Sequence, residues 1–542
     1  MAEEALDTEN ASAVLDEAHV GDITGALGTI REHDIGARRS WRARLLTLLA
    51  IIGPGLIVMV GDNDAGGVAT YSQAGQNYGL SLLWTLPLLV PVLIVNQEMV
   101  VRLGAVSRVG HARLIAERFG RFWGWFSVVD LFILNFATIV TEFIGVSLAL
   151  GYFGVSEYVS VPIAALGLVA MTASGSFRRW ERFMFVFIVA NLLVIPLAVY
   201  AHPHAGSVLS HLVVPGVRGG FNSTSVLLII AIVGTTVAPW QLFFQQSNIV
   251  DKRITPRWIN YERVDTILGS FVTVVAASLL VVAAAYAFEG TRQFGHFTNA
   301  AGVAGGLGRY LGHATGTLFS LVLLNASIIG AASVTLSTSY AFGDMFGVRH
   351  SLHRRIRDAK VFYLSFAGIV GVAAGIVLIP SAPLGLITTA VQALAGILLP
   401  SATVFLLLLC NDRAVLGPWV NRPWLNGVAT VIVSVLLVLS LILMTTTVFP
   451  HIDVPALLGA LAAVLVGVLL VMGALYVRAL RRRPAPAAIG ERGENWMMPP
   501  STLLERPPQS RARTATLYVM YGYLAVGVVM LGVKAIQLGL HK

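Results

Sequence analysis

Long, continuous apolar segments alternate with short polar segments along most of the chain. Each apolar segment is roughly 17–25 residues long, the length that crosses a bilayer as an α-helix. The apolar residues do not alternate with polar ones, so the pattern predicts helices and argues against a β-barrel. Thirteen spans are predicted near residues 45–76, 80–101, 123–150, 157–175, 183–201, 225–248, 264–288, 314–343, 361–380, 383–410, 425–449, 453–477 and 516–538.

Composition supports the same fold class. Apolar residues make up 56% of the chain and charged residues 12%, against roughly 25% charged residues in an ordinary globular protein. The mean hydropathy is +0.76. A chain with so few charges cannot cover a water-exposed surface, so we predict an all-α integral membrane protein. Its one cysteine, Cys410, excludes an intramolecular disulfide.

The positions of Lys and Arg predict the orientation. If the N-terminus is cytoplasmic, 32 of the 37 Lys and Arg residues fall in the tail and in cytoplasmic loops, as the positive-inside rule requires. The predicted external segments hold only Arg218, Arg292, Arg309 and Lys542. The net charge of +9 therefore calls for no nucleic-acid partner. The predicted location is a cell (inner) membrane, multi-pass, and the excess of Arg over Lys indicates a bacterial source.

The first predicted span carries a sequence that opposes a continuous helix. Gly53-Pro54-Gly55 is followed by Gly61-Asp62-Asn63-Asp64-Ala65-Gly66-Gly67. Each carboxylate inside an apolar span costs on the order of 3 kcal/mol, and glycines weaken the helix. We expect the helix to unwind there, so that freed carbonyls and an acid form a cation site. In the alternative interpretation, both acids lie at a helix end among the lipid headgroups.

The sixth span has a matching interruption in Gly234-Thr235-Thr236-Val237-Ala238-Pro239-Trp240-Gln241. Pro239 lacks a backbone donor and clashes with the preceding turn. Taken alone, this segment also fits an ordinary proline kink. Two interrupted spans, five apart, predict two inverted five-helix repeats with a binding site between the broken helices.

The predicted chain organisation follows from these spans and from composition. The first residues mix acidic side chains with a basic run and read as a disordered or loosely helical tail. A Pro- and Arg-rich stretch separates the last two spans. The predicted segments are a cytoplasmic tail (1–44), a ten-helix core of two inverted repeats (45–410), two further membrane helices (411–477), a cytoplasmic loop (478–515) and a last membrane helix (516–542).

Several motifs, taken in order, resemble those of the Nramp family of divalent-metal transporters. Asp64-Ala65-Gly66-Gly67 falls on the family's Asp-Pro-Gly-Asn motif, and Glu142-Phe143-Ile144-Gly145 resembles its third helix. Gln392, eight residues before Pro400, resembles its tenth helix. The resemblance covers about residues 45–450. It implies a LeuT-type fold, here with additional C-terminal helices.

The departures from the family pattern bear on the cargo. The family's amide ligand falls on Gly67, and its Met-Pro-His segment falls on Ala238-Pro239-Trp240. An acid of the family's third helix falls on Ile139, and a carbonyl ligand falls on Thr235. These substitutions resemble those of the Nramp-related magnesium transporter branch.

The chemistry of the remaining groups favours a hard cation. A thioether favours softer transition metals, and none is left here. Mg²⁺ is usually held by one or two carboxylates with several retained waters, which suits a roomy site of oxygen ligands, and Mn²⁺ is hard enough to share it. The predicted ligands are Asp64, the Thr235 backbone carbonyl and Gln392, with Ala65, Gly67, Ala238, Trp240 and Gln241 lining the site and Glu142 as a further intramembrane acid. In the alternative, residues such as Gln241, Gln245 or Asn325 replace the lost ligands.

The protein is predicted to be a secondary transporter or facilitator of divalent metal ions, with Mg²⁺ as the main ion and Mn²⁺ also carried. Trp240 and Ile139 cannot carry a proton, so we predict uptake without proton coupling. The alternatives are a proton-coupled Mn²⁺/Fe²⁺ importer and, less favoured, an organic-solute carrier on the same fold. No HExxH, Walker A or GxSxG motif indicates an enzyme. The metal is cargo and no cofactor is expected; the sequence leaves the oligomeric state open, and a monomer is compatible with it.

Overall fold

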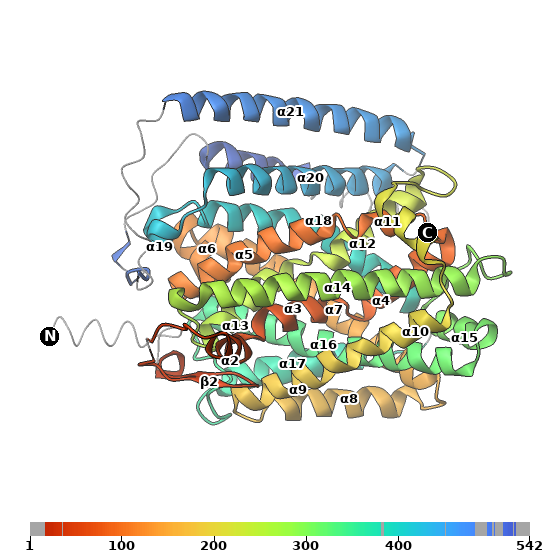
Figure 1. Cartoon of the computed structure of the whole chain (residues 1–542), viewed down its shortest axis with the longest axis horizontal. Helices are drawn as coiled ribbons and strands as arrows, with labels where there is room; N and C mark the ends of the chain where they lie inside the picture. Colours follow the sequence, from red (N-terminus) through yellow and green to blue (C-terminus); the bar gives the residue numbers. More distant parts are fainter. Residues whose placement is uncertain are drawn as a thin grey trace.

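The computed structural model of the chain describes residues 17–34, 36–380, 384–449, 451–482, 496–500, 503–504, 513–523 and 525–526. Nearly all of its regular structure is helical (Figure 1). Among these residues, ten helices are long and apolar enough to cross a membrane, or eleven if one bent helix pair forms a single span. The predicted all-α membrane class is confirmed.

The first repeat begins with an interrupted helix. Helix α3 (Pro54–Asp62) ends before Asn63, and α4 (Ala65–Tyr78) begins after Asp64. The predicted break is therefore present. The rest of this repeat comprises η2 (Leu83–Thr85), α5 (Leu89–Ser107), α6 (His111–Phe119), α7 (Arg121–Gly151), α8 (Glu157–Thr172), α9 (Phe177–Ala190), η3 (Asn191–Leu193) and α10 (Val194–Tyr200).

The second repeat begins in the same way. Helix α12 (Ser223–Thr236) and helix α13 (Pro239–Asp251) are separated by Val237 and Ala238. Pro239 is the first residue of α13, where its missing N–H costs nothing. The remaining elements are α11 (Ala205–Val213), which precedes this repeat, and η4 (Pro256–Trp258), α14 (Ile259–Phe288), α15 (Ala300–Tyr310), α16 (His313–Phe346), α17 (Lys360–Val377) and α18 (Leu384–Leu409) within it.

The two broken helices run in opposite directions and meet at their breaks. Helix α13 ends beside the N-terminal residues, because the Arg253 guanidinium donates to the Ala18 carbonyl at 2.8 Å, whereas α3 begins at that end of the molecule (Figure 1). The Tyr71 and Thr236 hydroxyls, one from each broken helix, lie 2.8 Å apart. This antiparallel crossing is the arrangement expected of inverted repeats.

The C-terminal helices pack on the outside of the two repeats. Helix α20 (Pro423–Val448) lies against α18, and α21 (Val454–Arg482) lies against α20 (Figure 1). Only 6% of the apolar window of α21 is buried, so this helix presents its side chains to lipid. The predicted last span is helical at residues 513–523 and otherwise lies largely outside the described residues. The short elements before α20 are α19 (Arg413–Leu416) and η5 (Gly417–Trp419).

The first predicted span is divided once more, ahead of the predicted break. Helix α2 (Trp41–Ile51) is a separate helix, and its axis is bent by 54° from that of α3. Gly53 has a φ of +154°, which only glycine adopts readily, and Pro54 starts a new helix. The fourth span is also shorter than expected, because α8 ends at Thr172.

The expectation of a disordered N-terminal tail is wrong for residues 17–34. After the short helix η1 (Glu17–His19), strands β1 (Ile23–Thr24) and β2 (Thr29–Ile30) form an antiparallel hairpin. Ile23 and Ile30 are each 4% exposed. The hairpin therefore buries apolar side chains against the helices, which a sequence without a long apolar run did not reveal.

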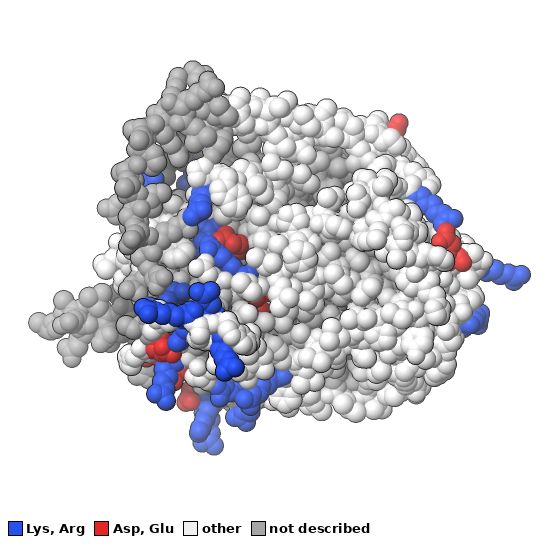
Figure 2. All heavy atoms as spheres, viewed as in Figure 1, with Lys and Arg blue, Asp and Glu red and all other residues white. Residues whose placement is uncertain are grey.

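Basic side chains gather at the end of the molecule that carries this hairpin. Figure 2 shows most of the visible Lys and Arg residues there, and few at the opposite end. The sides of the molecule between the two ends are almost free of charge on the face shown. This is the charge distribution of a protein whose helices cross a membrane from one end to the other.

Candidate metal site

Asp64 lies in the break of the first helix and caps α4. Its backbone is extended, and its Oδ1 accepts a hydrogen bond from the Gly67 N–H at 2.6 Å. The side chain is buried, with 4% exposure. The positive end of the α4 dipole stabilises a carboxylate at this position. Asp64 is therefore a buried carboxyl group in the break, at the predicted place.

Glu142 on α7 lies against Asp64. Its Oε2 accepts a hydrogen bond from the Ala65 N–H at 3.1 Å, and its carboxylate lies beside the Asp64 side chain. A Cβ atom at Gly330 of α16 would lie 2.8 Å from Glu142 Oε2 and 2.9 Å from Asp64 Cβ, so this glycine leaves room for the pair. Two carboxylates in contact repel each other unless a cation or a proton lies between them.

Gln392 and Thr235 reach the same break from two other helices. A Cβ atom at Gly66 would lie 1.6 Å from Gln392 Nε2, and one at Gly67 would lie 3.2 Å from Thr235 Oγ1. Thr235 is in the last turn of α12, where backbone carbonyls have no helical partner. The three predicted ligand positions, Asp64, Thr235 and Gln392, thus gather around the start of α4.

Polar atoms without hydrogen-bond partners surround this break. Such atoms are rare inside proteins and commonly mark a site for an ion or water. Asp62, in the last turn of α3, is fully buried, and Gln241 approaches it without forming a hydrogen bond of ordinary geometry. Among the described residues, the atoms without a partner here are both Asp62 carboxylate oxygens, Glu142 Oε1, Thr235 Oγ1 and Gln392 Nε2.

Asp62 is the residue that the sequence reasoning left out of the ligand set. The sequence does mark Asp62 as a candidate ligand, because it is one of two carboxylates in a glycine-rich interruption of an apolar span. The family resemblance directed attention to Asp64 alone. The structure places Asp62 two residues away on the other broken half-helix, with its carbonyl oxygen 3.2 Å from the position of a Gly67 Cβ.

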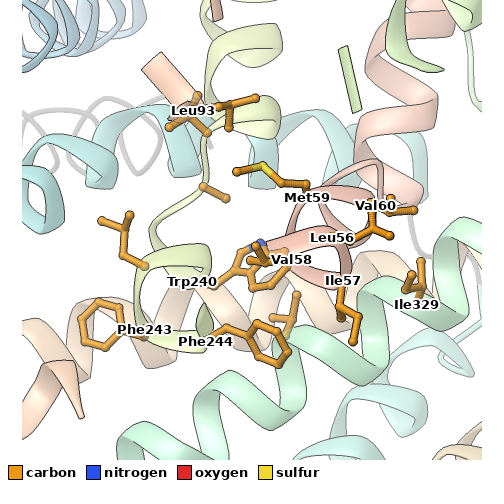
Figure 3. Packing of buried hydrophobic residues seen from close by; sticks show 14 of the residues in the cluster. Leu56, Ile57, Val58, Met59, Val60, Leu93, Trp240, Phe243, Phe244 and Ile329 are labelled. Carbon is orange, nitrogen blue, oxygen red and sulfur yellow. The ribbon is translucent and has the colours of Figure 1, made fainter. Parts of the chain in front are cut away.

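Of the predicted lining residues, Ala65 and Gly67 belong to α4, whereas Ala238, Trp240 and Gln241 belong to α13 and its N-terminal cap. Trp240 is 1% exposed and packs beside α3, close to Val58 and Phe244 (Figure 3). A Cβ atom at Gly61 would lie 3.5 Å from its ring. Gln241 accepts a hydrogen bond of 3.3 Å from Gln97 of α5. Trp240 thus fills the space between the half-helices, and Ala238 caps α13 without a side-chain hydrogen bond.

The residues that could replace the lost family ligands differ in their hydrogen bonding. Gln245 donates to Thr266 Oγ1 of α14 at 2.9 Å, so its amide nitrogen is engaged away from Asp64. Asn325 on α16 is buried, and its amide has no hydrogen-bond partner among the described residues. No group of three or more His, Cys, Asp or Glu side chains arranged to hold a metal ion occurs in the part of the chain that the structure describes.

A small cavity lies beside the start of α4, on the side of the break away from the hairpin. Ala65 and Ala69 of α4 line it on one side, and Thr141 and Gly145 of α7 line it on another. It reaches Asn299, which caps α15 on that side. Its walls are mostly apolar and its volume is about 10 Å³, which is room for about one water molecule.

Toward the hairpin end, the start of α3 is held by buried charges. Asp265 of α14 accepts three backbone N–H groups, from Gly53 at 3.0 Å, Gly55 at 2.7 Å and Leu56 at 3.1 Å. This carboxylate replaces the missing side-chain cap of α3. Lys252 forms a fully buried ion pair with Glu181 at 2.6 Å. These buried contacts fix the start of α3 on the hairpin side of the break.

Comparison with known proteins agrees with this architecture. The family model described as natural resistance-associated macrophage protein-like, or Nramp, matches residues 55–446. The chain belongs to the Nramp family. The divalent metal cation transporter MntH of Aeromonas hydrophila is 27% identical over 410 residues, which cover 72% of this chain and 94% of that protein. MntH of Bacillus subtilis is 27% identical over 425 residues, covering 74% and 93%.

A solved structure shares the fold. The crystal structure of the Eremococcus coleocola manganese transporter, in complex with an aromatic bis-isothiourea substituted compound, superposes with a TM-score of 0.62 at 20% identity, covering 85% of this chain and 98% of that chain. The predicted LeuT-type fold and the Nramp resemblance are confirmed. The chain is a multi-pass membrane protein of this family.

Proposed function

We propose that the protein transports divalent metal ions, with Mg²⁺ as its main cargo and Mn²⁺ also accepted. The observation that carries the proposal is the buried Asp64 carboxylate in the break of α3 and α4, facing Thr235 and Gln392. These groups offer oxygen donors and one negative charge. Mg²⁺ binds such donors while it keeps several waters, and the small Gly67 and Ala238 leave space for them.

Each residue has a proposed role at this site. Asp64 supplies the principal charge, the Thr235 carbonyl supplies a neutral oxygen, and Gln392 closes the site from α18 through its amide oxygen. Asp62 adds a second carboxylate on the opposite half-helix, within reach of a retained water. Ala65, Trp240 and Gln241 shape the walls.

The proposed transport is driven by the cation gradient and the membrane potential, without a proton. The potential alone supplies about 2 × 2.3 kcal/mol for a divalent ion at 100 mV. The positions that would extend a proton route are Ile139, which is buried and apolar, and Trp240. The runner-up is a proton-coupled transition-metal importer. The contact between Asp64 and Glu142 favours it, because such a pair can share a proton that an entering metal displaces.

Direct flux measurements separate these functions. The full-length protein in proteoliposomes with an internal Mg²⁺- or Mn²⁺-sensitive dye should show uptake of both ions, while a pH dye should stay constant. Asp64→Asn should abolish metal uptake, because the asparagine side chain still accepts the hydrogen bond from the Gly67 N–H but carries no negative charge. Acidification that follows metal entry and vanishes without metal would establish the runner-up. Absence of metal flux beside uptake of an amino acid would favour the organic-solute carrier.

The proposed location is the inner membrane of a bacterium, with the N-terminus and the basic end of the molecule in the cytoplasm. The charge distribution in Figure 2 supports this orientation through the positive-inside rule. Single cysteines at Ser40 and Ser210, on a background with Cys410 replaced, test it in intact cells. An impermeant thiol reagent should label position 210 and not position 40; the reverse pattern would invert the topology.

A further inference from the structure

A second cavity shares no lining residue with the break in α3 and α4. It has a volume of about 290 Å³ and lies between α5, the first turns of α14 and the segment that leads into α20. Its lining divides into two parts. The charged part consists of Glu98, Arg102, Arg263 and Arg422. The apolar part includes Ile94, Trp424 and Leu425.

The charged part carries an excess of positive charge. Glu98 accepts hydrogen bonds from Arg102 Nε at 2.9 Å and from Arg263 Nη2 at 2.6 Å, so one carboxylate is shared by two guanidinium groups. Arg422 is exposed and forms no hydrogen bond or ion pair through its side chain with any described residue. Three cations and one anion leave a net charge of +2, with guanidinium groups that match phosphate geometry.

Two of the three arginines, Arg102 and Arg263, are held in place by hydrogen bonds to the protein. Arg102 is 3% exposed and donates to the Trp419 carbonyl and to Asn421 Oδ1, each at 2.6 Å. These bonds attach the segment before α20 to α5. Arg263 is 27% exposed and also donates through Nη1 to Asn260 Oδ1 at 2.9 Å; each of its two terminal nitrogens carries a second N–H that can donate to a ligand. The cavity therefore offers an anion site at the basic end of the molecule, with one exposed arginine, Arg422, beside two fixed ones.

The apolar part continues into a surface suited to an acyl chain. Trp424 is 62% exposed, as is typical of tryptophan at a membrane–water interface. Val428, Val431 and Val435 follow it on one face of α20 and are 38%, 44% and 37% exposed. Their spacing of three to four residues places them in one stripe along the helix. This stripe begins at the cavity and runs toward the middle of the membrane-crossing region.

We propose that this cavity binds an anionic phospholipid. The phosphate group lies between Arg263 and Arg422, and one acyl chain follows the exposed face of α20. Basic pockets between membrane helices at the interface are suited to anionic headgroups. A free phosphate would use the arginines and leave the tryptophan and the valine stripe without a partner, so the two-part lining favours a lipid. A bound lipid would bridge α14 and α20 and stabilise the full chain.

The test uses delipidated full-length protein in detergent and does not depend on the transported cation. Phosphatidylglycerol, phosphatidylcholine and inorganic phosphate are compared by native mass spectrometry and by the apparent unfolding temperature. Phosphatidylglycerol should bind at least fivefold more tightly than phosphatidylcholine and should raise the unfolding temperature by several degrees. Arg422→Gln should remove most of this preference. Arg413→Gln, an exposed arginine on α19 at the same end and outside the cavity, should leave it unchanged.

Several results would overturn the proposal. Equal binding of the two lipids would show that the arginines do not select charge. An unchanged preference in both Arg422→Gln and Arg263→Gln would place the lipid elsewhere. Protection by inorganic phosphate alone, equal to that by phosphatidylglycerol, would establish an anion site without a lipid. None of these outcomes bears on Mg²⁺ flux, so the proposal and the proposed function fail separately.

Discussion

Glu142 Oε2 accepts a hydrogen bond from the backbone N–H of Ala65, over 3.1 Å. Ala65 is the first residue of the helix that Asp64 caps, so the α7 carboxylate supports the broken helix at the point where the proposed metal site begins. Any hydrogen-bond acceptor at position 142 can hold the Ala65 N–H in this way. The negative charge of Glu142 is a separate property, so the hydrogen bond and the charge can be tested with different substitutions.

Glu142→Gln should keep the folded protein and its Mg²⁺ uptake. The amide oxygen still accepts from Ala65, and the loss of one charge relieves repulsion with Asp64. Glu142→Leu leaves the buried Ala65 N–H without an acceptor, which costs about 1–3 kcal/mol. Unfolding temperature and proteoliposome flux measure the two effects. Loss of uptake in a folded Glu142→Gln variant would show that transport needs the second carboxylate.

The break in each repeat could be predicted from the sequence because helix-weakening residues and intramembrane polar residues fall together there. An acid in the first break could also be predicted from the residues, whereas the choice of Asp64 and the roles of Thr235 and Gln392 needed a family resemblance; the structure brings the three to one break. The N-terminal hairpin could not be predicted, because its strands are two residues long and Ile23 and Ile30 are buried by packing against α2, not by a local apolar run. The same holds for Asp265, which caps α3 across 210 residues; no local pattern encodes such a contact.

Lys252→Met should destabilise the protein strongly. Lys252 and Glu181 are both fully buried and form an ion pair at 2.6 Å, and Lys252 also donates to the Ile51 carbonyl at 2.6 Å. Removing one partner leaves a buried charge without compensation, at a cost of roughly 3–5 kcal/mol. The double variant Lys252→Met with Glu181→Gln should recover most of this loss in the unfolding temperature.

A matched control for this pair is Arg218→Gln. Arg218 pairs with Glu289 at 2.8 Å, but the two side chains are 52% and 56% exposed. Exposed ion pairs contribute about 0–1 kcal/mol, so this variant should unfold close to the wild-type temperature. A similar fall in unfolding temperature for Lys252→Met and Arg218→Gln would contradict the conclusion that burial makes the Lys252–Glu181 pair important.

His111, in the helix between α5 and α7, should make the protein less stable in mild acid. Burial disfavours its charged form and lowers the pKa of His111 to about 4, although Gln246 and Asp344 oppose the shift. The unfolded value is about 6.5, so the unfolded chain takes up the proton first as the pH falls. The stabilisation is complete above pH 6.5 and is lost toward pH 4, with a cost of roughly 2 kcal/mol between pH 7 and pH 5.

The measurement is the drop in unfolding temperature from pH 7 to pH 5. His111→Asn should show a smaller drop than the wild type, because the titrating group is gone. His296→Asn, at an exposed loop position, should match the wild type. An unchanged drop in His111→Asn would assign the acid sensitivity to other groups.

Gly67→Asn combined with Ala238→Met should shift selectivity from Mg²⁺ toward Mn²⁺. The amide and the thioether add ligands, and the thioether favours the softer ion. A Cβ atom at position 67 meets the Asp62 carbonyl and Thr235 Oγ1 at 3.2 Å, so the site must widen by a few tenths of an ångström. Competition between the two ions in the flux assay measures the shift, and Ala238→Met alone is the control for the thioether. An unchanged preference would place the selective contacts elsewhere.

Gly66→Ala should abolish transport through a contact with Gln392. The added Cβ would lie 1.6 Å from Gln392 Nε2, so the amide must swing away from the break, and the repacking costs about 1–3 kcal/mol. Gly427→Ala, which adds a Cβ on α20 with nothing within 4 Å, should leave flux unchanged. The double variant Gly66→Ala with Gln392→Ala removes the collision and should regain stability without regaining uptake, because the amide ligand is then absent. Restored Mg²⁺ uptake in the double variant would show that Gln392 fills space at the break and does not bind the ion.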